Sequence, residues 1–277
     1  MAFGLASGLA FAYLPIVKIG GMPLIAYRMP PRHLIKTLSK RLGVRLTSRT
    51  FAKPEQGRVA LDRVLDSGRL AGLQSSVFWL PYFPPEMRFH FNAHNLLAYG
   101  RDGDEYLLSD PVFEEPVRCA SADLQKARFA KGALAAKGLM YYLDDVSPEQ
   151  DWERLIRQSV LSTSRILDGM PLPWIGIRGI QHLAKCVEAL DPAQAKYNRL
   201  YLTHIVRMQE EIGTGGAGFR FMYASFLQEA GEKIGDASLQ EASSRLTAVG
   251  DDWRQFASAC VRASRSKGET PDFRPIA

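Results

Sequence analysis

The stretch Ala93-His-Asn-Leu-Leu-Ala-Tyr-Gly-Arg-Asp-Gly-Asp-Glu-Tyr-Leu-Leu-Ser-Asp110 has the pattern of a β-hairpin. Its first seven residues suit a buried strand, the next five have the composition of a turn, and five more suit the returning strand. If the turn is centred on Asp102, antiparallel pairing puts His94 opposite Asp110, with Cβ atoms about 5 Å apart. A carboxylate at that distance fixes the tautomer of a histidine and stabilises its protonated form. The hairpin therefore predicts two of the three members of a nucleophilic triad.

The segment before the hairpin favours a functional role for this histidine. Residues 78–87 contain three prolines, which exclude regular structure, and several aromatic side chains. We expect Tyr82, Phe83 and Asn92 to line a substrate groove beside His94. The alternative is a core histidine that is hydrogen-bonded to a neighbouring carbonyl group.

Composition limits the class of protein. With 46% apolar and 23% charged residues, the 277-residue chain is typical of a soluble globular protein with a full core. Its three cysteines are odd in number and lack a CxxC spacing, which argues against a disulfide framework or a zinc site. We therefore expect a reducing, cytoplasmic location and neither a metal nor a cofactor.

The uncharged, apolar first 17 residues resemble a signal peptide only superficially. No basic residue precedes them, two glycines and a proline interrupt them, and they are short for a membrane span. We expect a buried segment of a globular domain and no membrane partner.

Hydrophobic periodicity divides the chain into two parts. Helices and strands alternate in the first half, whereas apolar residues at helical spacing dominate the second, beginning with a helix around Trp152–Ile166. The junction falls near residue 145, within about 20 residues. We therefore predict an α+β domain over residues 1–145 and an all-helical domain over residues 146–277.

Positive charge is concentrated in the first part. Residues 28–69 contain 11 Lys and Arg against 3 Asp and Glu. These cations form either ordinary solvated helix faces or a surface for an acidic partner, such as a carrier protein, a nucleic acid or a phosphorylated substrate. No nucleic-acid-binding motif accompanies them, so we do not expect nucleic acid as the partner.

Three other constellations have weaker support. Residues 213–218 match G-x-G-x-x-G, but a charged helix precedes them where the dinucleotide motif needs a strand. We expect a loop between helices, with Arg220 as a possible anion-binding group at the next helix. His182 and Cys186 share a helix face without an orienting third group, and Cys119 follows Asp110 by nine residues. We expect none of these to be catalytic.

Three stretches carry a resemblance to a known family: Phe3-Gly-Leu-Ala-Ser-Gly-Leu9, Leu80-Pro-Tyr-Phe-Pro-Pro-Glu-Met-Arg-Phe-His-Phe-Asn-Ala-His94, and Ser109-Asp-Pro111. They resemble the family of butirosin-biosynthesis protein H. The second half, notably residues 177–184 and 213–220, resembles the helical domain of unknown function that often follows it.

The resemblance implies a fold and an activity. The family's N-terminal domain is similar to papain-like cysteine peptidases of the bacteriocin-processing type. Its founding member transfers an aminoacyl group from an acyl carrier protein to an aminoglycoside amine. By this resemblance, His94 is the general base and Asp110 the acid that orients it.

The chain departs from the family pattern at the nucleophile. Family members begin with a His-Cys segment, which supplies a thiolate at a helix N-terminus, where the helix dipole lowers the thiol pKa. The sequence contains no cysteine before residue 119. We expect a start assigned too late in preference to a natural version without a nucleophile.

The sequence thus predicts an acyltransferase-family protein of secondary metabolism. An acidic carrier protein would dock on the basic region, and an acyl group would pass from its thioester to a small amine through a Cys-His-Asp site. The alternative is a non-catalytic module that binds a carrier or a ligand. The upstream reading frame would discriminate between them, because an in-frame His-Cys pair favours the enzyme.

Overall fold

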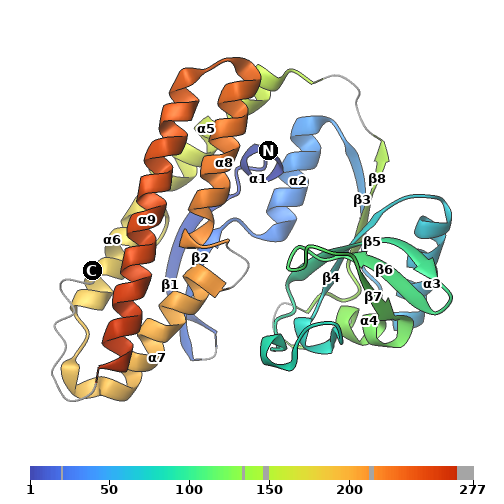
Figure 1. The fold of residues 1–277 in the computed structure, drawn as a ribbon, viewed down its shortest axis with the longest axis horizontal. Helices are drawn as coiled ribbons and strands as arrows, with labels where there is room; N and C mark the ends of the chain where they lie inside the picture. Colours follow the sequence, from blue (N-terminus) through green and yellow to red (C-terminus); the bar gives the residue numbers. More distant parts are fainter. Residues whose placement is uncertain (20, 133–134, 146–149, 212–214, 267–277) are drawn as a thin grey trace. The chain divides into compact units, whose positions relative to one another are not determined.

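The computed structural model describes the chain except for residues 20, 133–134, 146–149, 212–214 and 267–277 (Figure 1). The predicted α+β class with a helical C-terminal region is confirmed. The strands are β1 (Leu9–Ile19), β2 (Met22–Arg28), β3 (Arg45–Arg49), β4 (Ala71–Ser75), β5 (His94–Asp102), β6 (Glu105–Ser109), β7 (Val117–Ala120) and β8 (Met140–Asp145). The α-helices are α1 (Ala2–Leu5), α2 (Pro31–Leu42), α3 (Pro54–Asp66), α4 (Ser121–Arg128), α5 (Trp152–Leu167), α6 (Gly176–Glu188), α7 (Ala195–Val206), α8 (Arg220–Ile234) and α9 (Ala237–Arg265).

The chain forms two compact units that do not follow the predicted division into consecutive domains. Unit 1 combines Met1–Arg41 with Glu149–Ala277, and unit 2 is Leu42–Pro148. The second boundary lies near the predicted junction at residue 145. The first differs, because the N-terminal residues belong with the helical part and not with the sheet of unit 2.

Backbone hydrogen bonding explains why the N-terminal residues join the helices. The β1–β2 ribbon is antiparallel, and the Tyr13 N–H of β1 donates to the Trp174 carbonyl, which precedes α6, at 2.9 Å. Phe11 of β1 is fully buried, in edge contact with Tyr27, and its ring also faces Trp253 of α9. The expectation that the apolar first segment is buried is therefore confirmed as far as Tyr13, whereas Ile16 and Val17 are exposed. Among the described residues, no helix is long and apolar enough to span a membrane.

Helices α8 and α9 of unit 1 lie side by side (Figure 1). Gly235 ends α8 in the left-handed region, with φ +68°, which a residue with a side chain adopts only at a cost. Asp236 then caps α9 by accepting a hydrogen bond from the Ser238 N–H. This two-residue link reverses the chain direction.

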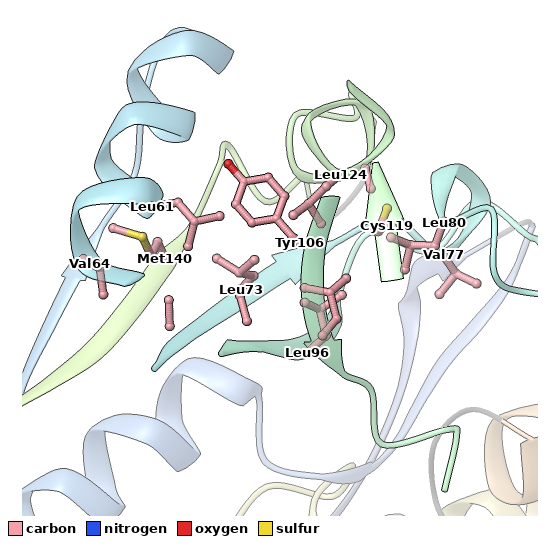
Figure 2. Close-up of a cluster of buried hydrophobic side chains, with 14 of the residues drawn as sticks. Leu61, Val64, Leu73, Val77, Leu80, Leu96, Tyr106, Cys119, Leu124 and Met140 are labelled. Carbon is pink, nitrogen blue, oxygen red and sulfur yellow. The ribbon is translucent and has the colours of Figure 1, made fainter. Parts of the chain in front are cut away.

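Unit 2 is built on a six-stranded sheet in the order β3-β8-β4-β5-β6-β7, in which every pairing is antiparallel. Figure 2 shows its core, which joins Leu61 of α3 and Leu124 of α4 to apolar side chains of the sheet. Leu73, Leu96 and Leu108 come from the adjacent strands β4, β5 and β6 and are almost fully buried. The hairpin of interest, β5–β6, thus lies within the sheet and not at an edge.

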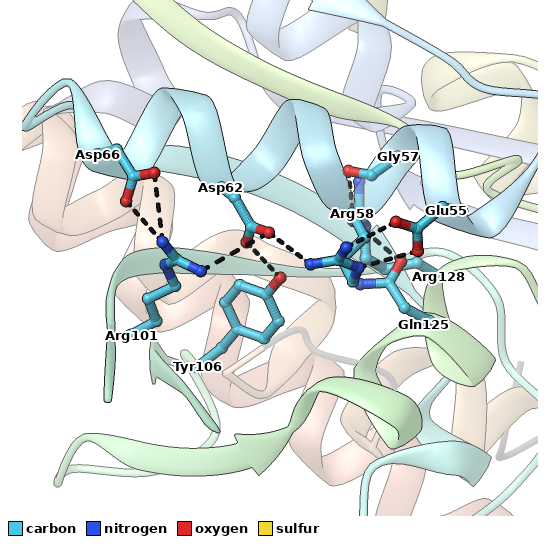
Figure 3. A network of polar contacts seen from close by, with 9 residues as sticks. All are labelled: Glu55, Gly57, Arg58, Asp62, Asp66, Arg101, Tyr106, Gln125 and Arg128. Carbon is cyan, nitrogen blue, oxygen red and sulfur yellow. Dashed lines mark hydrogen bonds and ion pairs between the residues drawn. The ribbon is translucent and has the colours of Figure 1, made fainter. Parts of the chain in front are cut away.

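A polar network also fixes that hairpin to α3 (Figure 3). The buried Asp62 carboxylate of α3 accepts hydrogen bonds from Tyr106 of β6, at 2.6 Å, and from Arg58, at 2.8 Å. Arg101 of β5 pairs with Asp66 at the end of the same helix. Because these contacts connect both strands to one helix, the far end of the hairpin has a defined position.

Candidate active site

The His94 and Asp110 side chains meet in the structure. The Nε2 atom of His94 lies 2.7 Å from the Oδ2 atom of Asp110. The Asp110 side chain has no exposed surface, and that of His94 is 11% exposed. A short, buried contact of this kind holds the imidazole in one orientation.

The strand register differs from the one that the sequence suggested. Strand β5 runs to Asp102, which pairs with Glu105, so the turn is Gly103–Asp104 and is not centred on Asp102. Gly103 has φ +59°, the left-handed value that tight hairpin turns require. The prediction that His94 lies directly across from Asp110 is therefore wrong, although the two side chains make the predicted contact.

A β-bulge accounts for the contact. Leu107 pairs with Gly100, whereas its neighbour Leu108 pairs with Ala98, so Tyr99 is an extra residue in β5. With the turn register continued, His94 and Asp110 would point to opposite faces of the sheet, because side chains alternate. The extra residue in β5 puts both side chains on the same face of the sheet. Asp110 thus points to the face that carries His94, and the side chains meet diagonally.

Two further donors hold the Asp110 carboxylate. The Tyr82 hydroxyl donates to Oδ2 at 2.8 Å, and the Val112 N–H donates to Oδ1 at 3.0 Å. Burial, followed by the charge of Asp110, raises the pKa of Tyr82, so the phenol stays protonated and remains the donor. Tyr82 therefore orients the carboxylate, and this contact differs from its predicted role in substrate binding.

Phe83 and Phe113 surround the pair with apolar surface. The Phe83 ring meets the His94 ring edge-on, with centroids 5.6 Å apart, and meets Phe113 at 5.0 Å. Phe83 is only 3% exposed, so it packs beside the site and does not form the open groove surface that the sequence suggested. Among the described residues, no hydrogen bond engages Nδ1 of His94, so this nitrogen is available to a reacting group.

Ser75 is a neighbour of the site that the sequence did not indicate. It pairs with His94 across the β4–β5 ladder, and it is fully buried. Its hydroxyl makes no hydrogen bond to a described residue. A lone serine at the end of a short apolar strand gives no signal in the sequence, because its importance comes from the strand pairing.

Asn92 has a structural position. It is 6% exposed, and its side-chain amide donates to the Lys131 carbonyl at 3.3 Å, while its own backbone carbonyl accepts from Gln74. These contacts attach the segment before β5 to its surroundings. They give no support to the predicted substrate contact.

Arg220 belongs to unit 1, whereas His94 belongs to unit 2. Its guanidinium lies over the Trp253 ring, 3.9 Å from the centroid, and donates to the Ala217 carbonyl at 3.1 Å. The side chain is 5% exposed, which argues against the predicted anion-binding role.

The described part of the glycine-rich loop binds an internal anion. Four consecutive residues from Gly216 to Phe219 have positive φ values, and the Ala217 N–H donates to the Glu210 carboxylate at 3.1 Å. A backbone of this shape forms an anion-binding concavity, which here holds a side chain of the same unit. Gly213 and Thr214 lie outside the described residues.

Cys119, the cysteine that shares unit 2 with His94, does not have the setting of a nucleophile, and the other two cysteines belong to unit 1. Cys119 lies in the core of unit 2, 1% exposed, and burial raises the pKa of its thiol to about 12. Cys260 of unit 1 is also buried, with a pKa raised to about 12 for the same reason. Cys186 belongs to unit 1, and its Sγ atom lies 3.9 Å from Nε2 of His182.

In the described parts of the chain, no three His, Cys, Asp or Glu side chains cluster as a metal site requires.

Comparison with a known structure gives a weak similarity. A crystal structure of a C39-like peptidase from Bacillus anthracis is 13% identical, with a TM-score of 0.32, over 45% of this chain and 64% of that one. The chain thus spans less than two thirds of that protein's length. The papain-like assignment stays a prediction. No curated protein matches the chain.

Comparison with protein families identifies both parts of the sequence. Residues 1–111 match the family described as Butirosin biosynthesis protein H, N-terminal. Residues 122–277, more than half of the chain, match the Domain of unknown function (DUF4872). The chain therefore belongs to the family in which a butirosin biosynthesis protein H N-terminal region is followed by this domain.

Proposed function

We propose that this protein takes part in cysteine-dependent acyl transfer, with His94 as general base and Asp110 as the acid that orients it. The observation that supports the proposal best is the 2.7 Å contact between these side chains around a carboxylate with no exposed surface. A buried carboxylate is costly unless its oxygens are hydrogen-bonded, and here Tyr82 and the Val112 N–H complete its bonding. Such an arrangement suits a histidine that must gain and lose a proton in a fixed orientation.

The proposed reaction has two steps. First, Nδ1 of His94 takes the thiol proton, and the cysteine thiolate attacks a carrier-bound thioester. The C–S bond to the carrier breaks, and the carrier sulfur takes the proton back from the imidazolium. Second, an amine attacks the acyl-cysteine, His94 accepts the amine proton, and the protonated histidine returns it to the departing cysteine sulfur. Atoms and charges balance without a metal or a redox cofactor.

The thiolate in this scheme is the cysteine of the His-Cys segment that the family resemblance implies. Nδ1, the ring nitrogen that makes no hydrogen bond to a described residue, is the atom that this sulfur would face.

The donor in this proposal is an acidic carrier protein that docks on the basic region of residues 28–69. Several of its cations are already engaged: Arg58 pairs with Glu55 and Asp62, and Arg69 pairs with Asp144. Within unit 2, exposed residues such as Lys53 and Arg63 stay available for docking. Carrier binding should weaken as ionic strength rises, and binding that is independent of salt would exclude this surface.

Acyl-enzyme formation tests the proposal. The protein encoded from the start of the family's His-Cys segment would be incubated with an acyl thioester, and its intact mass would be measured. We expect one added acyl group in the parent protein and almost none in the variants His94→Ala and Asp110→Asn. Equal acylation of all three proteins would exclude the proposed roles.

A non-catalytic binding module is the second candidate. It is supported by one observation, namely that Cys119, the single cysteine of unit 2, is buried in the core with a raised pKa. If the upstream reading frame has no cysteine codon, and the natural protein binds acyl carrier without forming a covalent adduct, this candidate replaces the enzyme.

A further inference from the structure

A basic pocket in unit 1 includes neither His94 nor Asp110, and its α2 residues fall within the basic region of residues 28–69. It is formed between α2 and α5 and has a volume of about 580 Å³. Its polar lining includes His33, Lys36, Lys40, Arg41, Arg154 and Gln158. A pocket of this volume falls in the range of small-molecule sites, which is about 300–1,000 Å³.

The charged side chains that line this pocket are all basic. None of its lining residues is acidic, and α2 contains no Asp or Glu along its whole length. Lys36 and Lys40 are one helical turn apart, and an i, i+4 pair of like charges destabilises a helix. In the described parts of the chain, no carboxylate pairs with either lysine. An anion bound between the helices would remove this repulsion.

Arg41 gives the pocket a fixed cation. Its Nη1 atom donates to the Leu5 carbonyl and to the hydroxyls of Ser7, at 2.8 Å, and Ser159, at 3.0 Å. All three acceptors are neutral oxygens, and partial burial lowers the pKa of Arg41. Its remaining guanidinium N–H groups have no hydrogen-bond partner among the described residues. A positioned, partly desolvated cation without a counter-charge is the usual setting for a bound anion.

Arg154 lines the pocket from α5. Its Nε atom is 3.4 Å from Oδ2 of Asp151, in an exposed pair that is worth little in water. The Arg154 guanidinium can therefore leave Asp151 and bind another anion. Its planar fork matches the oxygens of a phosphate group, which a lysine contacts as a point charge.

We propose that this pocket binds the phosphate group of a small phosphate ester. A phosphate dianion offers charge for Lys36 and Lys40 and several oxygens for the forks of Arg41 and Arg154. The concave shape and the fixed Arg41 distinguish this surface from an ordinary solvated helix face. The ligand is a free small molecule, since the pocket is open and its volume suits a ligand of that size.

Titration calorimetry with inorganic pyrophosphate at low salt tests the pocket. We expect binding at one site, with a Kd at least tenfold higher in the double variant Lys36→Ala/Lys40→Ala. The matched control is Lys185→Ala/Lys196→Ala, which removes the same charge from exposed positions of α6 and α7 in the same unit. The control should bind as the parent does. No saturable binding, or equal weakening in both double variants, would overturn the proposal.

Two additional measurements complete the test. Arg154→Ala should also raise the Kd for pyrophosphate, while Arg157→Ala on the same helix, whose partners are Glu153 and Asp236, should not. Circular dichroism melting would show that each variant is folded. Glucose 6-phosphate should bind at the pocket, and a phosphoserine peptide that binds more tightly than the sugar phosphate would overturn the assignment of a small-molecule ligand.

Discussion

Each unit of the protein pairs a histidine with a second chemically active side chain, and the two pairs differ in their support. In unit 2, His94 contacts a carboxylate that has no exposed surface and that accepts hydrogen bonds from two other groups. In unit 1, Nε2 of His182 lies 3.9 Å from the Cys186 sulfur on the same helix. The first pair joins separate elements of the fold, whereas the second follows from helical spacing alone.

The difference shows what makes such a pair suited to catalysis. Any two residues four apart on a helix share a face, so a Cys-His contact at that spacing has no specific meaning. The neighbours of Cys186 are phenols: Tyr13 and Tyr201 are hydrogen-bonded to each other at 2.9 Å. Burial raises the pKa of both, so they stay neutral and offer no charge to hold a histidine. Of these two histidines, His94 contacts an orienting carboxylate, and no described carboxylate is hydrogen-bonded to His182.

The largest expected effect comes from the replacement of that carboxylate. Asp110→Asn should lower the rate of acyl-enzyme formation, in a protein that carries the family's His-Cys segment, by a factor on the order of 10⁴, because the amide favours the wrong tautomer of the imidazole. The rate is measured by intact mass after rapid quenching. His182→Gln is the matched change in the other pair and should leave the rate unchanged. A loss smaller than tenfold for Asp110→Asn would remove the distinction between the pairs.

A second prediction compares two tyrosine hydroxyls. Tyr82→Phe removes a hydrogen bond to a buried charged group, which should lower the free energy of unfolding by about 2 kcal/mol. Tyr13→Phe removes a neutral hydrogen bond beside Cys186 and should cost about 1 kcal/mol. Urea denaturation of both variants measures the difference. Only Tyr82→Phe should also slow acyl-enzyme formation, and equal kinetic effects would argue that Tyr82 has no positioning role.

Alkaline pH gives a third, smaller effect. The folded protein raises the pKa of Cys119 and Cys260 to about 12, above the usual thiol value near 8.5. Above about pH 9 the unfolded chain therefore binds fewer protons than the folded chain, and stability falls as pH rises towards 12. Urea unfolding at pH 8, 10 and 11 measures this slope. The slope should be smaller for Cys119→Ala, and an identical slope would show that this thiol is not responsible.

The smallest effect concerns thiol reactivity at pH 8. A chromogenic disulfide should modify Cys186, which is partly exposed, and leave the two buried thiols intact until urea is added. His182→Ala should change the rate of Cys186 modification only slightly, because a contact of 3.9 Å is weak. A strong dependence on His182 would contradict the interpretation of this pair as incidental.

The sequence predicted the hairpin and its two polar residues but not how they meet. Strand β6 has the predicted bounds, since alternating apolar residues and turn chemistry mark it clearly. The extra residue in β5 has no local signature, because nothing in Tyr99 itself distinguishes a bulge from a regular strand position. The pairing of Ser75 with His94 likewise depends on β4, which precedes β5 by 18 residues.

Local sequence patterns also could not predict which part of the fold the N-terminal residues join. An apolar run predicts burial, and the buried Phe11 and Tyr13 agree with it. Tertiary contacts decide which residues cover that run. Here they include Trp174 and Trp253, which come from the second half of the chain. A prediction of consecutive domains could not anticipate such a pairing.

The bulge at Tyr99 has a consequence for how this hairpin can change in length. A single-residue insertion between Gly103 and Asp104 that kept a two-residue turn would alter the register by one and turn Asp110 away from His94, unless β5 lost its own extra residue at the same time. Such an insertion would otherwise have to be absorbed by a longer loop. The form of a surface turn and the contact between two buried side chains are thus coupled over the length of a strand.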